Sequence, residues 1–387
     1  MSIGSPDWKT LAPHRPLPPG SGHYISHPER HGDRLAEWIG AGGNTVLVGG
    51  PAGVGKSTEL ARAASQFHLY GYQSVLMQLD RALNLRRATP DRVLEVVIRM
   101  LGDLSEDWRS GLSEQLLAQL DSARRGLPFT GPTSIPPKQT ATLLLNQLSR
   151  ELEFPIVLIF DGLEKLDDSP RSAEIFQAIG ELPEDIHLLS TIPWHAAFGP
   201  HEELIRPGER FVSLPPAPVH TAAGRRFLLD ILARRLELPF FPSGSPEDLL
   251  HRNLPEGAPT PLEIAWTVHG APPEFPIVID RAVHSSGGLP RMFLQLLADA
   301  GTYARLRDGS GWPSMEHLEI AEREMSESLL RTLLPKDRQW LKPHNLQEAS
   351  EIDPTIKVRL LAHGLLLERR DDDGVRYYPH PLLDTHR

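Results

Sequence analysis

The first half of the chain alternates short apolar runs with polar or glycine-containing segments. Short runs that are apolar throughout are typical of strands buried on both faces of a parallel sheet. We predict strands at 45–49, 74–80, 154–161, 186–191 and 210–214. The first two are joined by a segment with helical spacing, and a strand–helix–strand order implies parallel pairing. The pattern therefore predicts an α/β unit built on a parallel sheet.

Apolar residues at intervals of three and four mark the helices of this half. Between Thr58 and Tyr70 four such residues share one face, and Gly71 follows as a typical helix end. Similar patterns predict helices at 29–39, 89–101, 105–125 and 174–179. The proline-rich segment 127–138 is predicted to be an exposed loop.

The chain changes character after Pro215–Pro218, a proline-rich boundary. Helical spacing then returns, and helices are predicted at 227–236, 278–283, 292–303, 315–334 and 353–362. Two β-type runs around a polar turn ending in Gly374 predict a terminal hairpin, and helices followed by a hairpin favour a winged-helix domain. The predicted regions are a flexible leader with a linker helix at 1–40, an α/β core at 41–218, a helical domain at 219–309 and a winged-helix-like domain at 310–387.

Composition narrows the class of protein. The formal net charge of −10 disfavours a general nucleic-acid binder, because attraction to phosphates requires an excess of Lys and Arg. The absence of cysteine excludes disulfides, cysteine-based zinc sites and thiol nucleophiles. The longest aliphatic or aromatic run, 156–160, is far shorter than the ~20 residues of a membrane-spanning helix, so no membrane association is expected. No apolar segment of a secretory signal is visible, and the expected compartment is the cytoplasm.

The most informative stretch lies between the first predicted strand and the helix that follows it. It reads Gly50-Pro51-Ala52-Gly53-Val54-Gly55-Lys56-Ser57, the pattern G-x-x-x-x-G-K-[ST] in the context that this motif requires. Glycines let successive backbone N–H groups approach a polyphosphate, and the helix turns the positive end of its dipole toward it. We assign these residues and Thr58 to nucleotide binding, with Lys56 on the β- and γ-phosphates and the Ser57 hydroxyl on Mg²⁺.

Asp161 ends the third predicted strand at the same sheet edge as this loop. It is predicted to hold Mg²⁺ directly or through water. Glu164 is the candidate to orient the attacking water, and a solvated carboxylate beside Lys165 is the alternative. Gly162 stands directly after Asp161, where many ATPases carry an acid. The sequence therefore supports nucleotide binding more strongly than hydrolysis.

Further candidates come from neighbouring segments. Ser190 or Thr191 could reach the γ-phosphate or its water from the end of the fourth strand, and Thr191 is the preferred choice; a plain strand-end hydroxyl is the alternative. Tyr24 and Ile25 lie just upstream of the core and are assigned to the adenine side, with packing without ligand contact as the alternative.

A second glycine-rich turn, Ser285–Arg291, precedes the helix predicted at 292–303. Pro290 suits a first helical turn, and Arg291 would lie at a helix N-terminus, where a cation is unfavourable unless an anion is near. A nucleotide phosphate would be that anion, and a surface acid is the alternative.

Four other polar residues carry weaker signals. Arg206 and Arg210 could act on the nucleotide of a neighbouring subunit, although solvated surface arginines are the favoured interpretation. His195 and His201 form no recognisable metal-ligand spacing.

Taken in order, the P-loop, Asp161, Thr191 and Gly288-Leu289-Pro290-Arg291 resemble the AAA+ superfamily. The chain is most similar to the origin-recognition-like and STAND branches, in which a P-loop core is followed by a helical lid and a winged helix. The resemblance covers about residues 23–387. It implies ATP or ADP with Mg²⁺ as ligands, Thr191 as sensor 1 and Arg291 as sensor 2, with Pro290 in a Gly-x-Pro motif. Gly162 and the lack of a clear arginine finger depart from the family pattern.

Three functions follow from this resemblance. The first is a slowly hydrolysing, nucleotide-dependent switch that controls a partner or effector protein or self-assembly through lid and winged helix. The second is a DNA-bound ATPase of the loader or transposition-helper type, and the third is a scaffold that keeps nucleotide as a structural ligand. From Met325 to Arg387 there are ten Lys/Arg and ten Asp/Glu, and the predicted wing tip is Asp371-Asp372-Asp373, which would repel DNA phosphates. The switch is therefore the preferred function.

Overall fold

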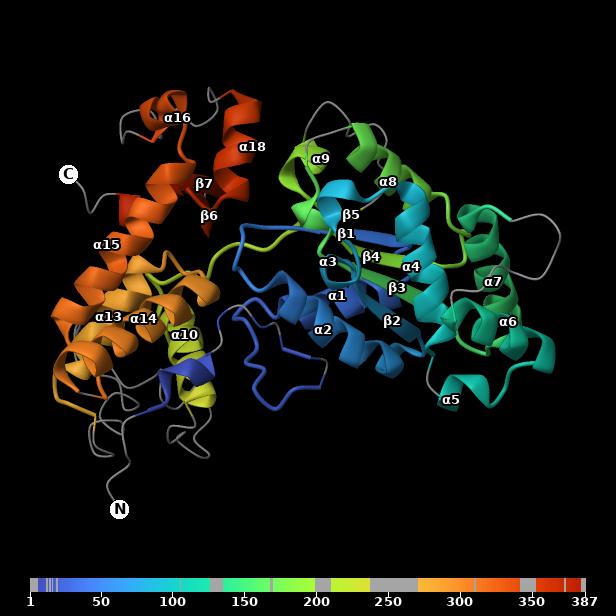
Figure 1. The fold of residues 1–387 in the computed structure, drawn as a ribbon, viewed down its shortest axis with the longest axis horizontal. Helices are drawn as coiled ribbons and strands as arrows, with labels where there is room; N and C mark the ends of the chain where they lie inside the picture. The colour runs from blue at the N-terminus through green and yellow to red at the C-terminus, as the bar shows by residue number, and fades with distance from the viewer. Residues whose placement is uncertain are drawn as a thin grey trace, which may run out of the picture.

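The first half of the chain folds around a five-stranded sheet (Figure 1). The computed structural model describes residues 6–11, 13, 15, 17–18, 20–104, 106–125, 135–167, 170–198, 210–236, 271–309, 311–341, 353–371 and 374–383. The sheet strands are β1 (Thr45–Gly49), β2 (Gln73–Gln78), β3 (Ile156–Asp161), β4 (His187–Thr191) and β5 (Arg210–Ser213). They lie in the order β2-β3-β4-β1-β5, and all pairs are parallel. The five predicted strands and the parallel character of the sheet are confirmed. The predicted pairing of the first two strands is wrong, because β3 and β4 lie between β2 and β1.

Helices cover both faces of this sheet. One face carries α1 (His31–Gly40) and α2 (Lys56–Gln66), whose Leu35, Ile39 and Leu60 pack with apolar residues of β1, β3 and β4. The other face carries α4 (Pro90–Gly102), α6 (Glu114–Arg124), α7 (Pro137–Glu151) and α8 (Pro170–Gly180). Strand side chains point alternately to the two faces, so a strand between two helical layers is apolar throughout. The core is therefore a three-layer α/β/α unit.

Short elements complete the core. They are the α-helices α3 (Leu79–Ala82), α5 (Glu106–Arg109) and α9 (Trp194–Phe198), and the 3-10 turns η2 (Phe67–Tyr70), η3 (Leu85–Arg87) and η4 (Leu163–Lys165). The helix predicted at 105–125 is two helices, because Ser113 caps α6 by accepting a hydrogen bond from the backbone of Leu116. The predicted loop 127–138 is shorter than expected, since α7 starts at Pro137, and residues 127–134 of it lie outside the described part of the chain.

A helical unit follows the core, and we call it the lid. It contains α10 (Ala222–Arg235), α13 (Phe275–Ser285) and α14 (Pro290–Asp308), whose apolar faces form a second hydrophobic core. No strand occurs between β5 and the terminal hairpin in the parts of this stretch that the structure describes. The predicted all-helical character of this unit is confirmed for those parts.

The C-terminal unit contains α15 (Met315–Thr332), α16 (Pro335–Trp340), α18 (Pro354–Ala362) and the antiparallel hairpin β6 (Leu366–Asp371) and β7 (Gly374–Pro379), before a 3-10 turn η6 (Pro381–Leu383). Its α15 packs on the lid through Leu318 and Ala321. The predicted helices and hairpin are present, whereas the winged-helix assignment stays a prediction, since residues 342–352 lie outside the described chain.

Part of the predicted flexible leader is held firmly against the lid. The 3-10 turn η1 (Trp8–Leu11) buries Trp8 and Leu11 in the lid core, and the Trp8 indole N–H donates a hydrogen bond of 2.7 Å to the backbone oxygen of Gly311. A Cβ on Gly301 would lie 2.3 Å from the Trp8 ring, so the lid helix leaves room for this side chain. The leader prediction thus needs correction here, because two large apolar side chains outweigh the surrounding Pro and Gly.

Candidate functional site

The P-loop is shaped by its glycines. Strand β1 is buried along its whole length and ends at Gly49, after which the chain turns sharply into α2. Gly53 and Gly55 have φ angles of 86° and 110°, a left-handed region that side chains disfavour. Gly55 is the N-cap of α2 and has no atom near the position of a Cβ, so the helix start faces open space. A helix N-terminus of this kind suits a phosphate.

Lys56 lies across this loop. Its ammonium donates hydrogen bonds to the backbone oxygens of Gly50 (2.9 Å) and Pro51 (3.1 Å), and the residue is only 6% exposed. Burial lowers the pKa of Lys56, and the carboxylate of Glu164 opposes that shift. The Lys56 ammonium therefore lies at the mouth of the loop near Glu164, where it could bind an anionic ligand.

Ser57 and Asp161 meet as the sequence predicted. The Ser57 hydroxyl donates a hydrogen bond of 2.9 Å to Asp161 Oδ1, and Asp161 is 3% exposed. Burial raises the pKa of Asp161 to about 6, with a further contribution from Glu164. Mg²⁺ keeps several waters and substrate phosphates among its ligands, so two adjacent protein oxygens fit a nucleotide-bound Mg²⁺. The described residues hold no group of three or more His, Asp or Glu that would bind a metal alone.

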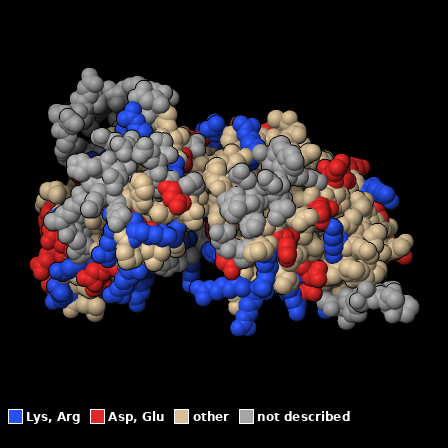
Figure 2. Space-filling model, turned by 90° about the horizontal axis from the view of Figure 1, so that it is seen from above, with Lys and Arg blue, Asp and Glu red and all other residues tan. Residues whose placement is uncertain are grey.

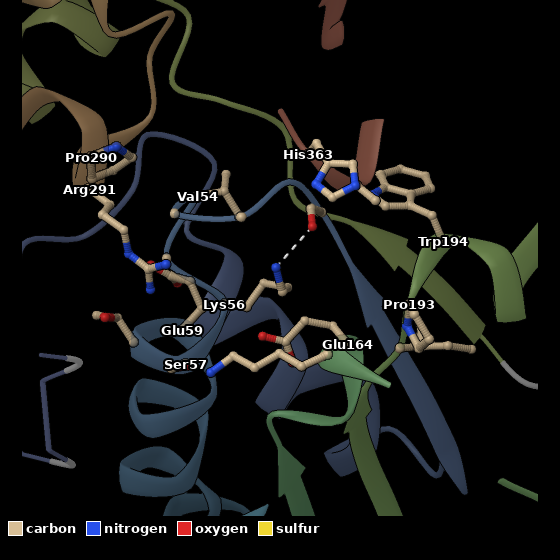
Figure 3. A pocket seen from close by; sticks show the side chains of 18 of the residues that line it. Val54, Lys56, Ser57, Glu59, Glu164, Pro193, Trp194, Pro290, Arg291 and His363 are labelled. Carbon is tan, nitrogen blue, oxygen red and sulfur yellow. Dashed lines mark hydrogen bonds between the residues drawn. The ribbon is translucent and has the colours of Figure 1, made fainter. Parts of the chain in front are cut away.

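Glu164 lies in η4 and lines the cavity beside Lys56 (Figure 3). Its Oε2 is buried and has no hydrogen-bond partner among the described residues. Gly162 explains why no acid directly follows Asp161: its φ is 100°, and a Cβ there would lie 3.0 Å from the backbone nitrogen and Cβ of Asp80. The positive φ and the close approach of Asp80 disfavour a side chain at that position. The next acid, Glu164, lines the cavity.

Thr191 is placed differently from a phosphate-contacting residue. Its side chain is fully buried, its hydroxyl accepts a hydrogen bond from the backbone N–H of Gly162 (3.1 Å), and it lies 3.4 Å from the backbone oxygen of Phe160. It does not line the cavity, and neither does Ser190, whose hydroxyl donates to the oxygen of Thr191. Thr191 fixes the loop after β3, and its predicted sensor role stays a prediction.

The lid reaches the P-loop through its second glycine-rich turn. The backbone N–H of Arg291 donates a hydrogen bond of 3.2 Å to the oxygen of Gly53, and a Cβ on Gly53 would lie 2.9 Å from the Cβ of Arg291. Pro290 starts α14, as predicted, and the first turn of this helix holds no acid. Pro290 and Arg291 both line the cavity, which Arg291 enters from the lid side and Lys56 from the loop side (Figure 3).

These groups surround one cavity of about 870 Å³. Its walls come from the P-loop, the N-terminal segment, the lid and the C-terminal unit. Pocket-lining residues that sequence reasoning missed include His23, Phe227, Ile231, Leu294, Trp194, Thr355, Val358, Arg359, Ala362 and His363. No local motif marks them, because they are ordinary helix or loop positions that only the tertiary fold brings to the P-loop.

The two residues predicted to lie on the adenine side, Tyr24 and Ile25, point to different places. Ile25 lines the cavity, whereas Tyr24 does not. Tyr24 points to α2, where its hydroxyl donates a hydrogen bond of 3.3 Å to Glu59 Oε2 and the Arg62 guanidinium lies 5.2 Å from its ring centre. Burial raises the pKa of Glu59 to about 7, although the backbone N–H of Gly32 donates to the same oxygen. The adenine contact of Ile25 stays a prediction, and Tyr24 packs on α2 instead of lining the cavity.

The remaining candidates lie outside the P-loop end of the site. Arg210 stacks on the Trp38 ring, with its guanidinium 4.0 Å from the ring centre. His195 lines the cavity, whereas Arg206 and His201 fall outside the described residues. Across the described part of the chain, no helix combines the length and the apolar character needed to cross a membrane.

Comparison with known proteins agrees with this geometry. Residues 33–190 match a family model described as AAA ATPase domain. No curated protein sequence matches the chain. The predicted AAA+ core is therefore confirmed.

Three solved structures resemble the whole chain. A Walker-type ATPase, paby2304, of Pyrococcus abyssi is 15% identical with a TM-score of 0.53, covering 96% of this chain and 98% of that one. The Orc1 protein of Aeropyrum pernix in complex with DNA is 17% identical, with a TM-score of 0.48 and coverages of 97% and 93%. The origin recognition complex of Drosophila bound to DNA is 12% identical, with a TM-score of 0.45 and coverages of 97% and 88%. The likeness to the Pyrococcus protein shows a shared fold.

Proposed function

We propose that this chain, whose residues 33–190 form an AAA ATPase domain, is an ATP-dependent conformational switch. ATP with Mg²⁺ binds in the cavity between core, lid and C-terminal unit and is hydrolysed slowly to ADP. The nucleotide state sets the position of the lid and the C-terminal unit. These units then control self-assembly or a partner protein.

The observation that carries the proposal is the direct contact of the lid with the phosphate loop. Arg291 donates its backbone N–H to Gly53, and its side chain enters the same cavity as that of Lys56. A phosphate between these two cations would contact the core and the lid at once. Because a ligand shifts an equilibrium only through different contacts in the two states, a group gripped by both units is able to couple them.

The C-terminal unit is tied to the same site. The Ser213 hydroxyl at the end of β5 donates a hydrogen bond of 3.1 Å to Glu368 of β6, and Leu367 packs in the core beneath the sheet. Trp194 of α9 packs against Leu360 and Ile356 of α18. Movement at the phosphate end would therefore reach all three units.

Different residues would bind the phosphates, hold Mg²⁺ and orient the water. Lys56 and Arg291 would bind the phosphate oxygens, and the Ser57 and Asp161 oxygens would hold Mg²⁺, which supplies charge neutralisation when bound. Glu164 is the group placed to accept a proton from, or orient, the attacking water. ATP is preferred over GTP by analogy with the AAA ATPase family.

Two variants test binding and turnover separately. Lys56→Ala removes the cation at the loop mouth and should weaken ATP binding at least ~100-fold, whereas Glu164→Gln should keep ATP affinity and lower turnover at least ~10-fold. Lys138→Ala is a matched control, because Lys138 is an exposed lysine paired with Glu181 and does not line the cavity. Calorimetric titration and phosphate release would measure both effects. Unchanged ATP affinity in Lys56→Ala would contradict the assignment of the site.

The switch itself is tested on the wild-type protein. Light-scattering mass and small-angle scattering would be recorded with ADP and with a slowly hydrolysed ATP analogue. We expect a change of mass or of radius of gyration between the two nucleotides. Identical values in both states, together with confirmed binding, would remove the switch and leave a scaffold that keeps nucleotide as a structural ligand.

A DNA-bound ATPase is the remaining alternative. On the face in Figure 2, Lys and Arg are interspersed with Asp and Glu over most of the described surface, which suits a mixed protein surface better than a duplex-binding face. A mobility assay at low salt with duplex DNA decides between them. Tight, salt-sensitive binding would favour the DNA function.

A further inference from the structure

A second lysine lies at the phosphate end of the cavity. Lys165 follows Glu164 directly in η4, and both line the cavity with Lys56 and Ser57. The side chain of Lys165 therefore borders the same cavity as Lys56.

Lys165 forms an ion pair with a single partner among the described residues. Its ammonium pairs with the carboxylate of Asp80, which lies in α3 after β2. The side chains of Lys165 and Asp80 are 53% and 28% exposed. An ion pair this open to water is weak, so the lysine is able to exchange one anion for another at little cost.

The backbone around this pair is rigid. Gly162 packs closely against Asp80, and the Thr191 hydroxyl accepts the Gly162 N–H. The base of η4 is therefore fixed, and the long side chain of Lys165 is the movable part. A flexible stem with a compact charge suits a residue that swings between two anions.

We propose that Lys165 senses the γ-phosphate: with a triphosphate bound, its ammonium leaves Asp80 and binds the terminal phosphate next to Glu164. This rests on the proposed nucleotide site and deepens it. With a diphosphate bound, the terminal group is missing and Lys165 stays on Asp80. Lys165 thereby supplies a third cation beside Lys56 and Arg291, from within the same chain.

The ion pair makes the proposal testable, because replacing Lys165 and replacing Asp80 should have different effects on the affinity for a triphosphate. Lys165→Met should lower the affinity for a slowly hydrolysed ATP analogue about tenfold, the equivalent of one charge-assisted hydrogen bond, and leave ADP affinity unchanged. Asp80→Asn frees Lys165 and should leave the ATP-analogue affinity equal or raise it about twofold to threefold. Lys165→Arg should keep most of the preference for the triphosphate. Calorimetry on the full chain with Mg²⁺ measures each affinity.

A purely structural role predicts a different result. If the pair only anchored η4, both Lys165→Met and Asp80→Asn would break it and lower analogue affinity alike, which would overturn the proposal. An unchanged analogue-to-ADP ratio in Lys165→Met would overturn it as well. Lys138→Met is the control for loss of an exposed, paired lysine elsewhere on the core. Failure of the wild type to bind either nucleotide would instead refute the proposed function, so the two failures are distinguishable.

Discussion

The molecule contains two glycine-rich turns that each lead into a helix, and the glycines nearest the two helices differ in what surrounds them. In the P-loop turn, Gly55 faces open space and leaves the N-terminus of α2 free for a ligand. In the lid turn, a Cβ on Gly288 would lie 2.1 Å from the backbone oxygen of Ala217, and one on Gly287 would lie 2.4 Å from a Leu367 methyl group. Gly55 thus leaves room for a phosphate, whereas Gly287 and Gly288 leave room for protein.

The difference shows why similar sequence patterns need different explanations. Gly288 lets the lid lie against the linker that follows the core, where its backbone oxygen accepts a hydrogen bond of 2.9 Å from Ala217. The lid turn is therefore a fixed point of packing, from which Arg291 projects into the cavity. We therefore expect Gly55 to matter for nucleotide affinity and Gly288 to matter for the packing between the units.

The largest expected effect comes from filling the lid turn. Gly288→Ala places a methyl group against backbone at a φ of +82° and should cost more than ~3 kcal/mol of unfolding free energy. Gly309→Ala is the matched control, since Gly309 also has a positive φ (+62°) but no atom within 4 Å of its Cβ position. Chemical denaturation of both variants measures the difference. Equal losses would show that strain alone, without the close approach, explains Gly288.

The next effect concerns the helix behind the P-loop and depends on pH. Burial raises the pKa of Glu59 from 4.5 to about 7, so the folded state binds a proton more tightly than the unfolded state. Stability from this group is complete below about pH 4.5 and is lost as the pH rises through about 7. Glu59→Gln cannot ionise, so this pH-dependent loss of stability should be absent. At pH values above about 7 the variant should therefore be more stable than wild type by up to ~3 kcal/mol.

Denaturation curves of Glu59→Gln and wild type at several pH values between about 4.5 and 8 give this difference directly. The other titrating groups are the same in both proteins, so their contributions cancel in the difference of unfolding free energy. A gap that shrinks with rising pH would contradict the buried, protonated state of Glu59 in the folded protein.

The smallest effect on stability is expected in the P-loop itself. Gly55→Ala introduces left-handed strain without a close contact, so we expect it to lose ~1 kcal/mol of unfolding free energy, the same loss that we expect for Gly309→Ala. Unlike that control, it should also lose ATP affinity about tenfold, because the methyl group lies where the loop turns its N–H groups toward the phosphates. If both variants bound ATP equally well, the open space at Gly55 would have another purpose.

The elements of this site that sequence reasoning found are those with local signatures. The P-loop needs glycines in fixed order, and β1 and β3 are apolar runs whose last residues lie at one sheet edge. The meeting of Ser57 and Asp161, more than a hundred positions apart in the chain, follows from that shared edge. Pro290 at the start of α14 follows from its fixed φ.

The parts that were missed depend on distant contacts. Trp8 stands among prolines and glycines, and its burial depends on Gly301 and Gly311 in another unit. Tyr24 and Ile25 are neighbours that point to different places, which no pattern distinguishes. The sequence of α18, which forms one wall of the cavity, has the pattern of an ordinary helix. Only the packing of α18 on Trp194 brings Arg359 and His363 to the cavity.

The burial of η1 in the lid has a mechanical consequence. The chain enters the lid at Trp8 and Leu11, crosses to the core at α1, and returns to the lid from β5 into α10. Core and lid are thus joined by two segments of chain, one before α1 and one after β5. While η1 stays packed in the lid core, any opening of the cavity has to move both segments together.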